Sequence, residues 1–167
     1  MTCGLSKGSI VGFRKMWSMG LCLATFGLAG CAGEVPAGLG LTEGRLAPCP
    51  DSPNCVSSQA ESGYAAMEPI DLDIPAQEAE ELLLAALRKM DRVEVVAVKP
   101  GYIHAEARSS IFGFVDDVEF AIDEADGVIH YRSASRMGYG DMNANRERMV
   151  EFWGQYGEMV AVQKVAT

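Results

Sequence analysis

The sequence predicts an α+β fold, a five-stranded, mostly antiparallel sheet with two helices on one face, in the order β-α-β-β-β-β-α. Five short runs have the patterns of strands, and short connections join the last four, which favours antiparallel neighbours. Two longer stretches repeat apolar residues at intervals of three and four, as amphipathic helices do.

The first strand and the first helix are expected between residues 69 and 90. PIDLDI (69–74) alternates apolar and acidic residues, which is typical of a half-buried strand. Pro75 suits the first turn of a helix, and acidic residues after it complement the positive end of the helix dipole. The apolar stripe of this helix comprises Ala79, Leu83, Ala86, Leu87 and Met90.

Four strands in a meander and a final helix are expected in the rest of the chain. The strands are 93–98, 102–109, 116–123 and 128–135, and the helix is expected from about Met142 to Val160. Alternation within the strands predicts an apolar face under the helices, comprising Ile103, Ala105, Ala107, Val118, Phe120, Ile122, Ile129 and Tyr131. The opposite face is expected to carry His104, Glu106, Arg108, Asp117, Glu119, His130 and Arg132.

The first thirty residues have the pattern of a secretory signal, with three basic residues before the uncharged stretch 16–30. The ending Leu28-Ala29-Gly30-Cys31 resembles the lipobox of bacterial lipoproteins. That resemblance implies cleavage before Cys31 and a diacylglycerol group on its sulfur, a stable anchor once the new amino terminus is also acylated. The alternative is an uncleaved membrane helix over residues 16–33, which falls short of the usual spanning length of about 20 residues.

Cleavage of this signal would leave 11 Lys and Arg against 23 Asp and Glu, a formal charge of −12. A domain this acidic repels phosphate backbones, so we expect no nucleic-acid partner. Anionic lipid headgroups would repel it as well, so the membrane contact is expected through the lipid on Cys31.

The signal also explains most of the cysteines, because Cys3 and Cys22 would leave with it. Cys49 and Cys55 remain, in CPDSPNC, and an exported protein meets oxidising conditions that favour a disulfide between them. Zinc is the weaker alternative, because the spacing is not that of a CxxC knuckle. The expected organisation is a signal (1–30), a lipidated tether with the disulfide-bearing segment (31–66) and the α+β domain (67–167).

Several side chains on the charged face are candidates for chemistry. Asp117 and Glu119 share a face at a separation of about 7 Å, and His104 or His130 could join them at a metal. A surface ladder of opposite charges is the favoured interpretation, and we expect no metal or cofactor. The apolar loop 111–114 (IFGF) either caps the core or contacts a partner or the bilayer.

The stretch RSASRMGYGDMNANR (132–146) is dense in hydrogen-bonding groups between the last strand and the final helix. Asn145 falls on the buried stripe of that helix, and Asp141 is placed to cap it. A buried polar network that pins the helix to the sheet is favoured. In the alternative, Arg132, Arg136 and Arg146 converge on an anion.

Three motifs together resemble the bacterial family called domain of unknown function 1499: PCPDSPNCVSS (48–58), FGFVDDVEF (112–120) and RSASRMGYGDMNANRERM (132–149). Gly140 stands where that family often has serine. The resemblance implies an exported, lipoprotein-like envelope protein and implies no reaction. It points to these positions as a candidate ligand-binding set: Arg132, Ser133, Ser135, Arg136, Asp141, Asn145, Arg146, Asp116 and Asp117.

The function expected from the sequence is that of an exported lipoprotein with a binding or envelope-support domain and no catalysis. The alternative is a hydrolase-type enzyme that uses the RSASR and DDVE segments, although no GxSxG elbow is present. Possible partners are an unknown envelope protein and a small anionic ligand. Residue 32 is alanine and not the aspartate of inner-membrane retention, so in a Gram-negative source we expect the outer membrane, facing the periplasm.

Overall fold

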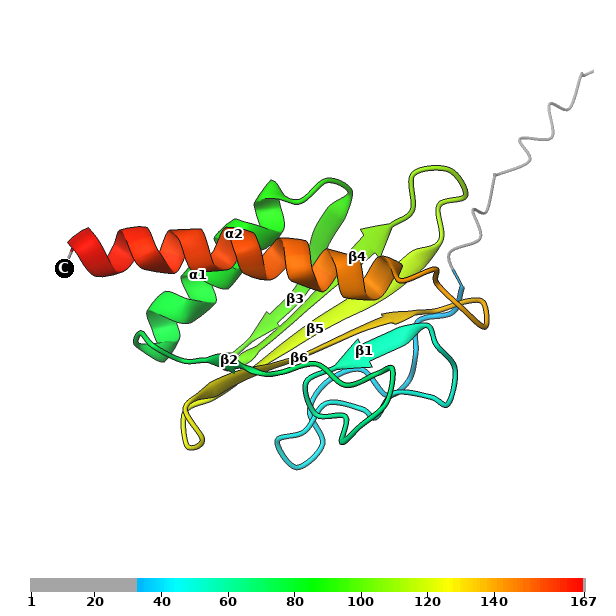
Figure 1. The fold of residues 1–167 in the computed structure, drawn as a ribbon, viewed down its shortest axis with the longest axis horizontal. Helices are drawn as coiled ribbons and strands as arrows, with labels where there is room; N and C mark the ends of the chain where they lie inside the picture. Colours follow the sequence, from blue (N-terminus) through cyan, green and yellow to red (C-terminus); the bar gives the residue numbers. More distant parts are fainter. Residues whose placement is uncertain (1–32, 167) are drawn as a thin grey trace, which may run out of the picture.

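The computed structural model describes residues 33–166, so Cys31 and the predicted signal lie outside the described residues. The described part is an α+β fold, as predicted, in which one mostly antiparallel sheet carries two helices (Figure 1). The strand order is β1-β6-β5-β4-β3, and β2 pairs with the other end of β6. The elements are β1 (Cys55–Ser57), β2 (Ile70–Asp71), α1 (Ala76–Lys89), β3 (Val93–Lys99), β4 (Tyr102–Arg108), β5 (Val115–Asp123), β6 (Val128–Ser135) and α2 (Ala144–Ala166).

Both helices cover the same face of the sheet, and the hydrophobic core lies between them and the strands (Figure 1). The predicted apolar face is confirmed: Phe120 and Tyr131 are fully buried there with Phe152 of α2. The ring centroids of Phe120 and Phe152 lie 4.8 Å apart, within the range of favourable aromatic pairs. Leu83 and Leu87 of α1 complete the same cluster.

The register of the meander places successive residues of β5 on opposite faces. Phe120 lies opposite Ile103 and Tyr131, on the face that the helices cover. Glu119 lies opposite His104 and Arg132, on the face that the helices do not cover. We call the latter the far face of the sheet.

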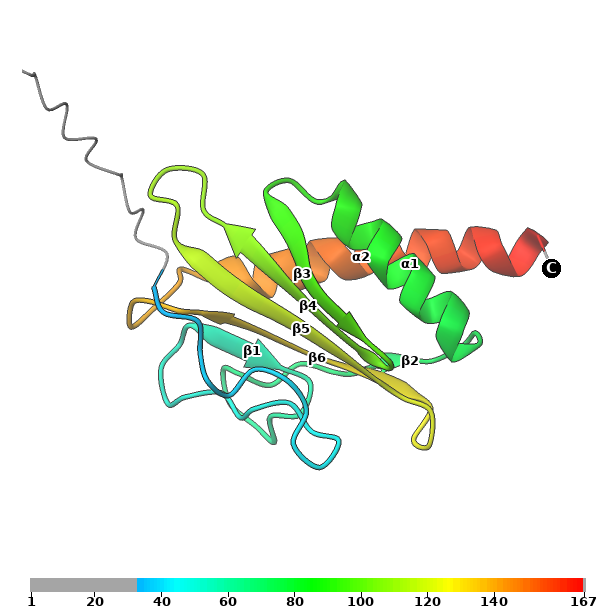
Figure 2. The same cartoon turned by 180° about the vertical axis from the view of Figure 1, so that it is seen from behind.

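The segment before β1 crosses this far face (Figure 2), although the sequence suggests a tether there. Leu46 is buried and clusters with Tyr102 and Ala121, while the Gly40 N–H donates to Glu119 Oε1 at 2.8 Å. The charged side of the sheet is therefore covered from residue 40 to residue 46 and is not the exposed ladder that alternation alone predicts. Regular structure also begins before Met67, because β1 pairs with β6.

Two further elements differ from prediction. PIDLDI forms only the two-residue β2, since Pro69 and Pro75 bracket it and limit its pairing. The final helix begins at Ala144, because Met142 and Asn143 adopt positive φ angles of 54° and 70°. Met142 is consequently 96% exposed and does not belong to the buried stripe.

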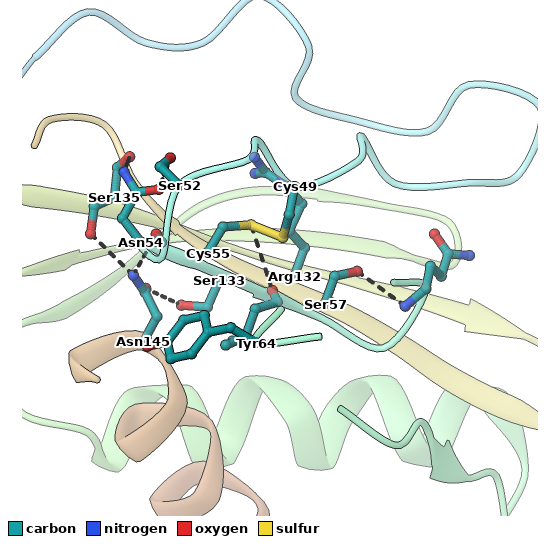
Figure 3. The surroundings of a disulfide bond; sticks show 12 residues. Cys49, Ser52, Asn54, Cys55, Ser57, Tyr64, Arg132, Ser133, Ser135 and Asn145 are labelled. Carbon is teal, nitrogen blue, oxygen red and sulfur yellow. Dashed lines mark hydrogen bonds between the residues drawn. A yellow bond between two sulfur atoms is a disulfide. The ribbon is translucent and has the colours of Figure 1, made fainter. Parts of the chain in front are cut away.

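The predicted disulfide is confirmed, since Cys49 and Cys55 are bonded (Figure 3). Cys55 is the first residue of β1 and is fully buried. The bridge ties the segment that crosses the far face to the edge strand beside β6. Within residues 33–166, no helix combines the length and the apolar character needed to cross a membrane.

Candidate functional site

The sheet divides the predicted site residues between its two faces. Asp117 and Arg132 lie on the far face, and Arg136 reaches it from just beyond the end of β6. Asp116, Ser133 and Ser135 lie on the helix side, where Ser133 contacts α2 through Asn145. The three predicted arginines do not meet, because Arg146 donates to the carbonyls of Tyr64 and Ala66 on the helix side.

We call the charged cluster on the far face the far-face network; it comprises His104, Glu106, Asp117, Glu119, Arg132 and Arg136. Arg136 holds Asp117 through two hydrogen bonds, Nε to Oδ2 at 2.9 Å and Nη2 to Oδ1 at 2.7 Å. The same Nη2 reaches Glu106 Oε1 at 2.5 Å, and His104 Nε2 lies 2.8 Å from Asp117 Oδ1. Paired, two-pronged contacts of this kind are the strong form of the arginine–carboxylate bond.

Burial and ion pairing shift the pKa values of Asp117 and Arg136 in opposite directions. Burial raises the pKa of Asp117, but hydrogen bonds and charge from Arg136 and His104 outweigh it and hold that pKa below its usual value. The hydrogen bond to Asp117 raises the pKa of Arg136. Both groups are therefore ionised at neutral pH, and the Arg136 side chain is only 4% exposed.

Glu119 is the deepest charge in the far-face network, with no exposed surface. Its Oε1 accepts from Tyr102 Oη at 2.7 Å and from the Gly40 N–H, and its Oε2 accepts from Arg132 Nη1 at 3.2 Å. Burial, together with the bond to Glu119, raises the pKa of Tyr102, which keeps the phenol a donor. Both carboxylate oxygens are thus occupied by the protein itself.

A second cluster, which we call the helix-face network, joins β6 to α2 and comprises Asn54, Asp116, Ser133, Ser135, Asn145 and Arg148. Asn145 is fully buried at its centre (Figure 3). Its Nδ2 donates to the Asn54 carbonyl and to Ser135 Oγ, both at 3.0 Å. Its Oδ1 accepts from Ser133 Oγ at 2.6 Å.

Arg148 and Asn54 are the members of this network that the predicted set of site residues lacked, and Arg148 is the one with charge. Its Nη1 donates to Asn145 Oδ1 and its Nη2 to Asp116 Oδ2, each at 2.6 Å. The spacing of three residues after Asn145 places the two side chains on the same side of a helix, and this spacing was the available signal. Arg148, and not Arg146, is therefore the arginine that binds the first carboxylate of DDVE.

The loop between β6 and α2 is held at several points. Asp141 caps α2 as predicted, since its carboxylate accepts from the N–H groups of Asn143 and Asn145, both at 3.0 Å. The Asn54 side chain of the disulfide motif donates to the Gly138 carbonyl at 2.8 Å. The third sequence motif thus meets the first through backbone carbonyls, and the second motif meets the third through the bond from the Arg136 N–H to the Val115 carbonyl.

The geometry offers little to a hydrolytic reaction. Ser133 is buried on the helix side, whereas His104 and Asp117 pair on the opposite face. The Ser58 hydroxyl lies 3.1 Å from His130 Nδ1, but it also accepts the Tyr131 N–H at 2.9 Å and so continues the β1–β6 pairing. Five of the clefts on the surface of the described residues lie away from both networks, because no member of either network lines them.

The family model described as Protein of unknown function (DUF1499) matches residues 45–155. The chain belongs to the DUF1499 family. A comparison with the curated proteins gives no match. The DUF1499 match runs from the disulfide segment into α2 and contains all members of both networks, so the networks are part of the family domain.

Asp117→Asn should flatten the dependence of the free energy of unfolding on pH between about pH 5 and pH 3. The folded pKa of Asp117 lies below its usual value of 3.8, so the unfolded chain takes up this proton first as the pH falls. The stabilisation is complete above that usual value and is lost as the pH falls through the folded pKa. Urea unfolding at several pH values measures it, with Asp126→Asn in an exposed turn as control. Equal slopes for the wild type and Asp117→Asn would contradict the assignment.

Proposed function

We propose that this DUF1499 protein is an exported lipoprotein, anchored through Cys31, whose α+β domain binds a partner or supports an envelope assembly without catalysis. Three features support export: the basic and apolar pattern of residues 1–30, the lipobox-like Leu28–Cys31, and the Cys49–Cys55 disulfide. Disulfides persist in oxidising compartments outside the cytoplasm. The alanine at position 32 favours the outer membrane, facing the periplasm, in a Gram-negative cell.

One observation carries the non-catalytic part of the proposal: most of the candidate polar groups satisfy one another, and among the candidate side chains only Arg132 has a buried polar atom, its Nε, without a hydrogen-bond partner in the described residues. Arg136, the best-placed cation, uses Nε and Nη2 on Asp117 and Glu106, and Asn145 uses both of its amide atoms within the helix-face network. A catalytic group must reach a substrate in a concave site, and none of the five clefts includes these residues.

The same observation bears on the kind of partner. Arg136 is engaged by Asp117 and Glu106, so a small anion that binds its Nε and Nη2 would have to displace buried carboxylates that belong to the protein. A partner that binds the outer surface of the domain does not need to displace these carboxylates. We therefore propose an envelope protein as the partner. In this proposal the two networks stabilise the fold of the domain whose outer surface the partner binds.

Inhibition of the lipoprotein signal peptidase by globomycin should cause uncut precursor to accumulate, because cleavage before Cys31 requires that enzyme. Cys31→Ser should also prevent lipidation and cleavage, whereas Cys22→Ser, a matched change within the signal, should be processed normally. Immunoblots of membrane fractions report the two forms. Unchanged processing of the wild type under globomycin would refute the lipoprotein assignment.

A further inference from the structure

The described chain begins at one end of the sheet, close to the point where β6 ends. A Cβ built on Gly33 would lie 2.9 Å from Arg136 Cβ and 3.0 Å from Met137 Cγ, so this glycine packs directly on the loop between β6 and α2. Figures 1 and 2 show the first described residues at this end in both views. Cys31 precedes Gly33 by two residues, which span at most about 7 Å. Any lipid on Cys31 is therefore attached at this end of the domain.

Two loops leave the sheet at the same end: 109–114, between β4 and β5, and 136–143, between β6 and α2 (Figure 1). They are neighbours, because the Arg136 N–H donates to the Val115 carbonyl at 3.0 Å. Both loops expose large apolar side chains, with Ile111 at 82% and Tyr139 at 77% exposure. The exposed set comprises Ile111, Phe112, Phe114, Met137, Tyr139 and Met142.

These exposed side chains sit in uncharged sequence. SSIFGF (109–114) and MGYG (137–140) contain no Asp, Glu, Lys, Arg or His, in a chain of which 22% is charged, and Arg136 and Asp141 flank the second stretch. At the other end of the sheet, the turn between β5 and β6 reads EADG and exposes Glu124 and Asp126. Gly113 has a φ of 67°, so the first loop turns in the left-handed region that favours glycine, and the Phe112 and Phe114 rings lie together at 5.6 Å.

We propose that these two loops form a membrane-contact surface that inserts into the headgroup region of the bilayer holding the Cys31 lipid; the proposal rests on the lipid anchor proposed above. Exposed apolar side chains gathered at one end of a domain are typical of contact sites, and aromatic side chains favour the membrane interface. The anchor holds the loops at high effective concentration above the bilayer. The acidic remainder of the domain then points away from the headgroups, and the exposed β5–β6 turn faces the aqueous side.

The test uses the full-length lipidated protein in vesicles of phosphatidylethanolamine and phosphatidylglycerol that carry brominated acyl chains. Its other mature cysteines are lipidated or bridged, so Phe112→Cys accepts one polarity-sensitive fluorophore, and Ala125→Cys in the β5–β6 turn is the matched control. We expect blue-shifted emission at position 112 and lipid quenching at least about threefold stronger than at position 125.

Each outcome separates the two proposals. An intact mass without lipid on Cys31 would overturn the proposed function and the membrane-contact surface together. Lipidated protein with equal quenching at both positions would overturn only the membrane-contact surface. A fluorophore at position 112 that is shielded from aqueous iodide but not reached by the brominated lipid would show that protein, such as a second copy of the chain, covers the loop, and this also overturns the bilayer assignment.

Discussion

Replacing Arg136 by alanine should lower the free energy of unfolding by about 3–5 kcal/mol, the usual cost of removing one partner from a buried ion pair. The change leaves Asp117, which is 1% exposed, with His104 as its remaining partner, and it removes the charge that ionised Asp117 needs at neutral pH. Glu106 loses its bond at the same time and keeps only Arg108. Equilibrium unfolding in urea measures the loss.

Arg108→Ala is the matched control for this prediction, because Arg108 binds the same Glu106 but is 45% exposed. Exposed pairs contribute at most about 1 kcal/mol, so this variant should unfold near the wild-type midpoint. The free energy of unfolding of Arg136→Lys should lie between those of Arg136→Ala and Arg108→Ala, since an ammonium group keeps the charge but cannot reproduce the two-pronged contact with Asp117. If Arg136→Ala keeps wild-type stability while envelope function is lost, the far-face network is a binding site and our proposal of a structural role is wrong.

Most of the fold follows from the sequence because strand alternation and helix periodicity are local signals. The four strands of the meander and α1 lie close to their predicted ranges, and residues such as Phe120 and Tyr131 are buried as the alternation predicts. The disulfide was also predictable, since only Cys49 and Cys55 remain once a signal and a lipidated cysteine are set aside.

Long-range pairing explains most of what the sequence did not predict. β1 is three residues long and carries too little alternation to be recognised, and it becomes a strand only because β6 offers it an edge. The glycine-rich stretch before it has no periodicity, yet its Gly40 N–H meets the buried Glu119 from 79 residues away in sequence. Because this segment lies over the far face, the charged residues that alternation predicts to be exposed are covered.

The sequence indicates which polar residues gather at the junction, but it predicts only some of the pairs that they form. Polar residues at the junction do join α2 to the sheet by hydrogen bonds, as expected from Asn145 on a buried stripe. The separation of Asp116 from Asp117 also follows from alternation. Which arginine meets which carboxylate depends on where α2 begins, and the two left-handed residues at 142 and 143 shift that start, so that Arg148 takes the position near Asp116.

Asn145→Ala should cost about 2–4 kcal/mol of the free energy of unfolding, because buried partners that lose their bonds each cost about 1–3 kcal/mol. The Asn54 carbonyl and the Ser133 hydroxyl would lose a partner in a region without solvent access, and Arg148 would lose one of its contacts. Glu151→Gln, on the exposed side of the same helix, should stay within about 0.5 kcal/mol of the wild type.

Hydrogen exchange distinguishes a lost helix anchor from a general loss of stability. If the helix-face network pins α2, the amides of its first turns should exchange faster in Asn145→Ala than global unfolding of that variant accounts for. The amides of β4 and β5, which keep their pairing, should exchange only at the rate of global unfolding. Uniform acceleration across both regions would contradict local pinning. Wild-type stability with lost function would instead make Asn145 part of a binding site, since its five polar contacts would then be dispensable for folding.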